Sequence, residues 1–130
     1  MDLIGMKRLV LALGAFATLV IFLRAGGTLA ALIDFHSLVF LGWCLLPLGH
    51  LWTFGRDDDP QSARIVLLAA AAMAVLFGVW VYVDVMVIHL DAQSGIAFIV
   101  VPLMQMAMVL PAILGAWILR RRARAAPARG

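Results

Sequence analysis

The stretch RIVLLAAAAMAVLFGVWVYVDVMVIHL, residues 64–90, decides the fold of this chain. After Arg64 it contains no charged residue until Asp84. An α-helix rises about 1.5 Å per residue, so roughly 20 apolar residues cross a hydrocarbon core of about 30 Å. Residues 64–90 therefore predict a helix that spans a membrane.

Three further apolar blocks, Leu9–Leu23, Thr28–Phe54 and Gly95–Leu119, are separated by short polar breaks. Hydrophobic residues make up 65% of the 130 residues and charged residues 13%, which is more apolar surface than a water-soluble domain of this size can bury. We predict an all-α membrane protein, a four-transmembrane-helix bundle forming one domain over residues 1–124. The expected helices cover about 5–25, 28–54, 60–90 and 94–120, and residues 125–130 are expected to form a disordered basic tail.

The first block also has features of a cleavable signal peptide. Lys7 and Arg8 precede the apolar run, and Thr28-Leu29-Ala30 is acceptable as a cleavage site. Cleavage there would leave three helices. Apolar sequence continues directly after Ala30 without a polar start, so we expect the first helix to be retained.

The distribution of Lys and Arg predicts how the helices are threaded. Arg24 is alone in the first break, and the third break has neither residue. With both termini in the cytoplasm, nine basic residues lie inside and one outside, as the positive-inside rule requires. The nine are Lys7, Arg8, Arg56, Arg64, Arg120, Arg121, Arg122, Arg124 and Arg129. The predicted topology therefore has a cytoplasmic N-terminus and a cytoplasmic C-terminus.

Composition also narrows the source and the class of protein. The chain has no Glu, and Arg outnumbers Lys nine to one, a bias typical of GC-rich bacterial genomes. We therefore expect a multi-pass protein of a bacterial inner membrane. The basic residues lie at helix ends, where they orient the helices, so the net charge of +3 does not indicate nucleic acid.

Small residues recur one helical turn apart in the last two blocks. Ala70, Ala74 and Gly78 form one such series, and Ala112 and Ala116 form another. Small residues at this spacing let helices approach closely in lipid. The pattern predicts a compact bundle.

The second break, GRDDDPQSAR at residues 55–64, has the chemistry of a helix start. Asp59 is expected to cap the third helix, and Pro60 suits its first position. Three adjacent carboxylates also suggest a divalent metal. Consecutive side chains diverge, however, and no other acidic ligand is near in sequence, so no metal site is expected.

Ionisable groups inside a membrane are costly and are candidates for function. Asp34 and Asp84 each lie six residues from the outer end of their predicted helix, and His36 and Gln105 lie deeper. These four residues are predicted to form an intramembrane polar cluster. Two carboxylates at one level would share a proton, and an imidazole nearby could exchange it, which describes a proton relay or a cation pocket.

A structural interpretation of the same residues is equally open. Asp34 and His36 are two positions apart and face about 200° from each other on a straight helix. Asp34 could face the outer interface or pair with Arg24. Asp84 could be a buried carboxyl group that bonds Gln105, Tyr82 or a backbone carbonyl freed by a helix bend.

Haem is the one cofactor that the histidines suggest. A bis-histidine b-type haem needs two His at matching depth on facing helices, and His36 with His89 is the available pair. The two differ in predicted depth by about 10 Å by helical rise, which disfavours haem. We expect no cofactor.

The chain contains no GxSxG, HExxH, P-loop or Rossmann pattern and no evident nucleophile–base pair, so we do not expect an enzyme. The leading hypothesis is a non-enzymatic accessory or assembly subunit that acts through helix–helix contacts, with a membrane-protein partner or as a homo-oligomer in the lipid bilayer. The alternatives are a small proton-coupled transporter or channel working as a homo-oligomer, and a haem-binding membrane protein.

Overall fold

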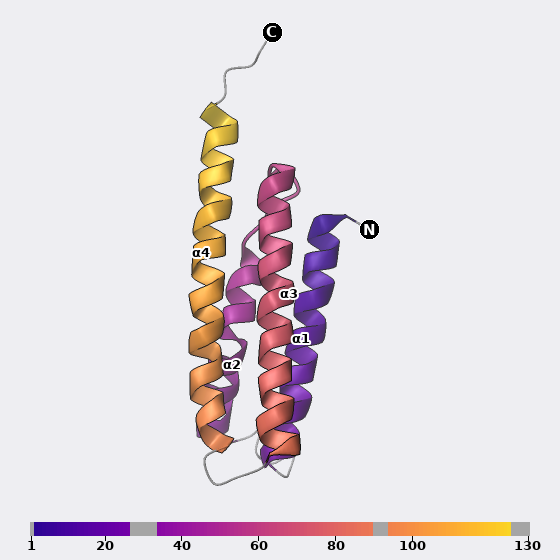
Figure 1. Cartoon of the computed structure of the whole chain (residues 1–130), viewed down its shortest axis with the longest axis vertical. Helices are drawn as coiled ribbons and strands as arrows, with labels where there is room; N and C mark the ends of the chain where they lie inside the picture. The colour runs from indigo at the N-terminus through magenta and orange to yellow at the C-terminus, as the bar shows by residue number, and fades with distance from the viewer. Residues whose placement is uncertain (1, 27–33, 90–93, 126–130) are drawn as a thin grey trace.

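The computed structural model describes residues 2–26, 34–89 and 94–125. Its helices are α1 (Leu3–Gly26), α2 (Phe35–Thr53), α3 (Gln61–Val83) and α4 (Ala97–Ala125). A π-helical turn, η2 (Asp84–Ile88), extends α3, and a short 3₁₀ helix, η3 (Ser94–Ile96), precedes α4. The four α-helices run alternately up and down, and α4 extends beyond the others at the C-terminal end (Figure 1).

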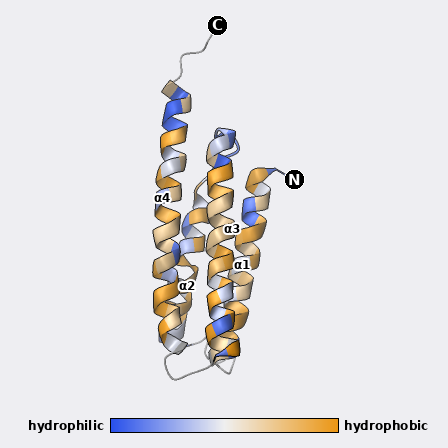
Figure 2. Cartoon of the chain, viewed as in Figure 1, coloured by the Kyte–Doolittle hydropathy of each residue, from blue (hydrophilic) through white to orange (hydrophobic). Residues whose placement is uncertain are grey.

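All four helices are long and apolar enough to cross a membrane, with spans at Leu3–Ala25, Phe35–Thr53, Gln61–Met86 and Ala97–Ala125. Hydrophobic residues follow the helices along most of their length (Figure 2). Among the described residues there is no strand. The prediction of an all-helical chain with four potential membrane spans is confirmed.

The core is built around small residues of α3. Ala71 and Ala74 are completely buried, Ala70 and Gly78 are buried on the same helix, and Ala116 of α4 belongs to the same buried cluster as the three alanines. Small side chains let the two helix backbones approach, and van der Waals contact then stabilises the pair in lipid. The predicted small-residue packing is confirmed for these positions.

A second buried cluster contains an aromatic stack. Ile21, Cys44, Tyr82 and Val101 come from the four helices in turn. Phe98 of α4 lies between two rings, with centroids 5.3 Å from Tyr82 and 5.6 Å from Phe22. These contacts hold together the part of the bundle near η2.

The observed helix ends correct two expectations. Asp34, expected inside a helix that starts at Thr28, is the N-cap of α2, and its carboxylate accepts a hydrogen bond from Ser37 N. Residue 60 rather than Asp59 is the N-cap of α3, and it makes no side-chain capping bond, since proline offers no acceptor there. The predicted helix over residues 28–33 and the predicted tail over 126–130 lie outside the described residues.

Candidate functional site

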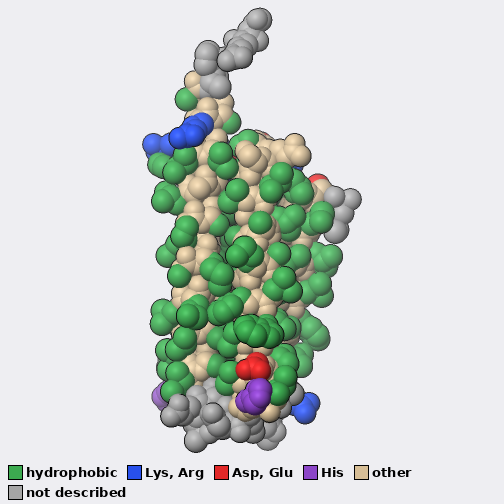
Figure 3. All heavy atoms as spheres, viewed as in Figure 1, with side chains coloured by type: hydrophobic (Ala, Val, Ile, Leu, Met, Phe, Trp, Pro, Cys, Tyr) green, Lys and Arg blue, Asp and Glu red, His purple; other side chains and the backbone are tan. Residues whose placement is uncertain are grey.

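The bundle has two different ends. At one end, here called the Lys7 end, lie the start of α1, the end of α2, the start of α3 and the C-terminal part of α4 (Figure 1). At the other, here called the Asp84 end, lie the end of α1, the start of α2, η2 and the start of α4. Hydrophobic side chains cover the face between the ends in Figure 3. Most of the Lys and Arg side chains in this view lie at the top, and His side chains lie at the bottom with an acidic side chain and one basic side chain.

Asp34 and His36 lie at the Asp84 end. Because Asp34 caps α2, its side chain is turned to the helix start and remains 58% exposed. His36 is 86% exposed, and its Nδ1 lies 3.9 Å from Asp34 Oδ2. This distance is too long for a hydrogen bond, so the two residues form at most a weak, exposed ion pair.

Asp84 and His89 form a closer pair at the same end. Asp84 starts the π-helical turn, which closes through a hydrogen bond of 2.7 Å from His89 N to Asp84 O. The side chains then meet, with His89 Nδ1 3.1 Å from Asp84 Oδ1. The wider turn brings residues five positions apart onto one side. Single π-turns inside helices often occur at functional sites.

Gln105 lies in the interior of the bundle. It is 3% exposed, and its Nε2 donates a 2.8 Å hydrogen bond to Ala74 O on α3. The absence of a side chain at Gly78 makes room for this amide, because a Cβ there would lie 2.2 Å from Nε2. Its Oε1 is buried and has no hydrogen-bond partner among the described residues. Gln105 therefore joins α4 to α3.

The structure distributes the predicted cluster over separate places. It pairs Asp34 with His36 and Asp84 with His89, and in the described part of the chain no hydrogen bond or ion pair joins either pair to Gln105. Whether these groups move a proton stays a prediction.

The two candidate haem ligands fit haem poorly. A haem ligand lies within an apolar pocket that surrounds the macrocycle. The side chains of His36 and His89 are 86% and 72% exposed, and His89 is already paired with Asp84. Within the described ranges, no group of three or more His, Cys, Asp or Glu is placed to hold a metal ion.

Lys7 is the most deeply buried charged residue of the described chain, with an exposed fraction of 0%. Its Nζ donates to Leu51 O at 2.9 Å and also to Phe54 O. These carbonyls belong to the last turn of α2 and to the residue after it, where backbone acceptors lack helical partners and the helix dipole favours a cation. Lys7 therefore caps the C-terminus of a neighbouring helix.

Gly55 makes this cap possible. Its φ of +100° lies in the left-handed region, which glycine adopts without steric cost. A Cβ at this position would lie 2.9 Å from Lys7 Nζ. After the end of α2 the backbone passes close to the Lys7 ammonium group, and it can do so because residue 55 has no side chain.

An ion pair completes the Lys7 end. Asp59 Oδ2 accepts a 2.6 Å hydrogen bond from Arg56 N and lies 2.8 Å from Arg120 Nη2. The side chains of Asp59 and Arg120 are 3% and 18% exposed, so the pair is poorly screened by water. The connection between α2 and α3 is thereby joined to α4.

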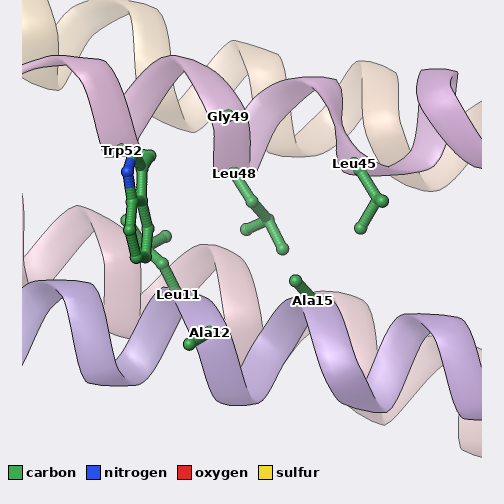
Figure 4. Close-up of a pocket in the computed structure, with 7 residues that line it drawn as sticks. All are labelled: Leu11, Ala12, Ala15, Leu45, Leu48, Gly49 and Trp52. Atoms are coloured by element: carbon green, nitrogen blue, oxygen red, sulfur yellow. The ribbon is translucent and has the colours of Figure 1, made fainter.

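An apolar groove runs between α1 and α2. Its volume is 180 Å³, and its lining residues are Leu11, Ala12, Ala15, Leu45, Leu48, Gly49 and Trp52 (Figure 4). Leu11 and Leu48 are buried at its base, whereas Ala12, Gly49 and Trp52 are exposed. We call this feature the α1–α2 groove.

Gly49 in this groove is not required for packing within the chain. A Cβ at Gly49 would meet nothing within 4 Å. Glycine inside a helix costs about 1 kcal/mol relative to alanine, and no contact among the described residues offsets that cost at Gly49. The open space over Gly49 leaves room for a neighbouring helix.

Sequence reasoning misses the roles of Lys7, Asp59 and the α1–α2 groove. The charge pattern indicates Lys7 only as a charge that orients the first helix. Its position just before the first apolar block, together with Gly55 after the second block, is nevertheless consistent with a buried cap on the second helix. No sequence pattern predicts the groove, because the groove depends on which faces of α1 and α2 are left uncovered by the other helices.

Comparison with known protein families, with curated proteins and with solved structures finds no match for this chain.

Proposed function

We propose that this protein is a small non-enzymatic subunit of a bacterial inner membrane, with both termini in the cytoplasm, that binds a transmembrane helix of a partner protein. The observation that carries the proposal is the α1–α2 groove. Its lining side chains are uncharged and mostly aliphatic, and its exposed Ala12 and Gly49 let a helix backbone approach.

A helix fits this groove better than lipid does. Acyl chains are flexible and cover any apolar face, so they do not require small residues at fixed positions. A packed helix does require them, because its backbone must come close for van der Waals contact to accumulate. Exposed Gly49 lies with exposed Ala12 in one groove, and this combination favours a protein partner.

Exchange of Gly49 for leucine tests the proposal. A larger side chain fits the isolated chain, since a Cβ at Gly49 meets nothing within 4 Å, but it would fill the groove. The protein is purified from its own membranes in mild detergent, and its native mass is recorded. We expect a second polypeptide with the wild type and its loss with Gly49→Leu.

Gly115→Leu is the matched control. A Cβ at Gly115 would likewise meet nothing within 4 Å, but this residue lies on α4, outside the groove. The control is expected to keep the partner. Retention of the partner by Gly49→Leu, or a wild-type mass of a single chain with lipid only, would contradict the proposal.

Proton-coupled transport by a homo-oligomer is the second candidate, and the π-helical turn at Asp84 favours it. This turn places a carboxylate and an imidazole 3.1 Å apart near the end of a membrane span. Asp84 lies within the span and His89 just beyond it, and ionisable groups inside a membrane span are typical of proton pathways. If the purified wild-type protein has the native mass of a homo-oligomer, that result would support this candidate over the first.

Asp84→Asn distinguishes transport from a structural role. In liposomes, transport predicts that this variant assembles normally and loses pH-dependent flux, while Asp57→Asn at the other end keeps it. Wild-type liposomes without pH-dependent flux would eliminate the second candidate.

A further inference from the structure

A hollow with polar walls lies at the Lys7 end. It has a volume of 280 Å³ and lies between the connection of α2 to α3 and the last turns of α4. Its lining residues are Asp58, Asp59, Pro60, Arg120, Ala123 and Arg124. We call it the headgroup hollow.

Two of its four charged residues neutralise each other. Asp59 is bonded to Arg56 N and paired with Arg120, so its carboxylate is satisfied. Arg120 is held by this pair, and its Nε is buried without a hydrogen-bond partner in the described part of the chain, out of reach of a ligand in the hollow.

The other two charges are free. Asp58 and Arg124 are exposed, and neither takes part in an ion pair among residues 2–26, 34–89 and 94–125. The hollow therefore offers an unpaired negative group and an unpaired positive group on opposite walls, one from the loop and one from α4. A ligand that carries both charges would satisfy both walls.

The hollow lies where headgroups are expected. The α3 span begins at Gln61, directly after lining residue Pro60. On α4, the Arg121 guanidinium lies 3.9 Å from the ring centroid of Trp117, which is 42% exposed. An exposed Trp with an Arg one turn further is typical of the boundary between hydrocarbon and headgroups.

We propose that the headgroup hollow binds the headgroup of phosphatidylethanolamine. The phosphate would accept a hydrogen bond from Arg124, and the ammonium would donate to Asp58. Both are charge-assisted bonds, which are about twice as strong as neutral ones. Phosphatidylcholine has no ammonium donor, and phosphatidylglycerol brings no positive charge to Asp58. This inference rests on the proposed membrane location.

Native mass spectrometry of the purified protein tests this preference. The protein is titrated with dioleoyl phosphatidylethanolamine, phosphatidylcholine and phosphatidylglycerol, one at a time. We expect phosphatidylethanolamine to reach half occupancy at about fivefold lower concentration than either of the others, the ratio that one exposed charge pair supplies. Equal occupancy of the three lipids, or a preference for phosphatidylglycerol, would overturn the proposal.

Three variants identify the walls of the site. Asp58→Asn should abolish the preference over the other two lipids, and Arg124→Gln should weaken all three. Arg122→Gln, an exposed arginine of α4 outside the lining, is the control and should change nothing. An unchanged preference in Asp58→Asn would also overturn the proposal. Gly49→Leu should keep the lipid preference, so that this proposal and the helix-docking proposal fail independently.

Discussion

The Lys7 end and the Asp84 end of the bundle use charged residues in opposite ways. At the Lys7 end, contacts join segments far apart in sequence, as in the Lys7–Leu51 bond across 44 residues, and the groups are buried. At the Asp84 end, the pairs Asp34–His36 and Asp84–His89 each lie within one short segment and are exposed. The Lys7 end therefore stabilises the fold, whereas polar groups at the Asp84 end are available for other roles.

Lys7→Ala should have the largest effect on stability. The variant leaves two carbonyl acceptors at the end of α2 without their donor and removes a buried side chain, which we expect to lower the free energy of unfolding by about 3 kcal/mol. Thermal unfolding in detergent, followed by circular dichroism, measures the loss. Arg8→Ala, at an exposed neighbour, should be nearly neutral. Equal melting temperatures for the two variants would contradict the conclusion that the Lys7 end stabilises the fold.

Asp59→Asn should have the next largest effect. Asparagine keeps an acceptor for Arg56 N but loses the charge that faces Arg120, so we expect a cost of about 2 kcal/mol. Asp57→Asn, at an exposed position of the same loop, is the control and should be within about 0.5 kcal/mol of the wild type. If Arg120→Gln is combined with Asp59→Asn, the two losses should not add, since one ion pair is removed once.

Asp34→Ala should have a smaller effect at the Asp84 end. It removes the N-cap of α2 and its bond to Ser37 N, which we expect to cost about 1 kcal/mol. Asp34→Ser keeps a capping oxygen and should recover most of this loss. A cost for Asp34→Ala as large as that of Lys7→Ala would show that both ends are equally important for stability.

Asp84→Asn should have the smallest effect on stability. The pair with His89 is exposed, and exposed pairs contribute about 0–1 kcal/mol. We expect a change of at most about 0.5 kcal/mol in the same unfolding measurement. A larger loss would mean that the π-helical turn depends on this carboxylate, and it would weaken the transport candidate.

The sequence predicts the helices well and their contacts only in part. Hydrophobic length alone predicts four helices, and the spacing of Ala70, Ala74 and Gly78 predicts close packing in a bundle, where the structure buries all three residues. These features are local and follow from helical geometry. The start of α2 is different, because Asp34 is equally compatible with a position inside a helix and with a cap.

The contacts of the Lys7 end could not be read from the sequence. A lysine near a helix start normally reaches water or headgroups, and only the position of α2 beside α1 turns Lys7 inward to Leu51 O. Likewise, Asp59 has the sequence context of a helix cap, yet Arg120 lies near enough to bind it once α4 is packed. The partners of Lys7 and Asp59 therefore depend on which helices pack beside them rather than on the local sequence pattern.

The cap on α2 also has a consequence for how the chain is assembled during synthesis. A chain that leaves the ribosome N-terminus first exposes Lys7 before its acceptors exist, since Leu51 follows 44 residues later. Until then the ammonium group of α1 has only water or headgroups as partners. Burial of α1 at this end therefore has to wait for the second helix and for Gly55, so the first two helices are expected to reach their final depth in the membrane together.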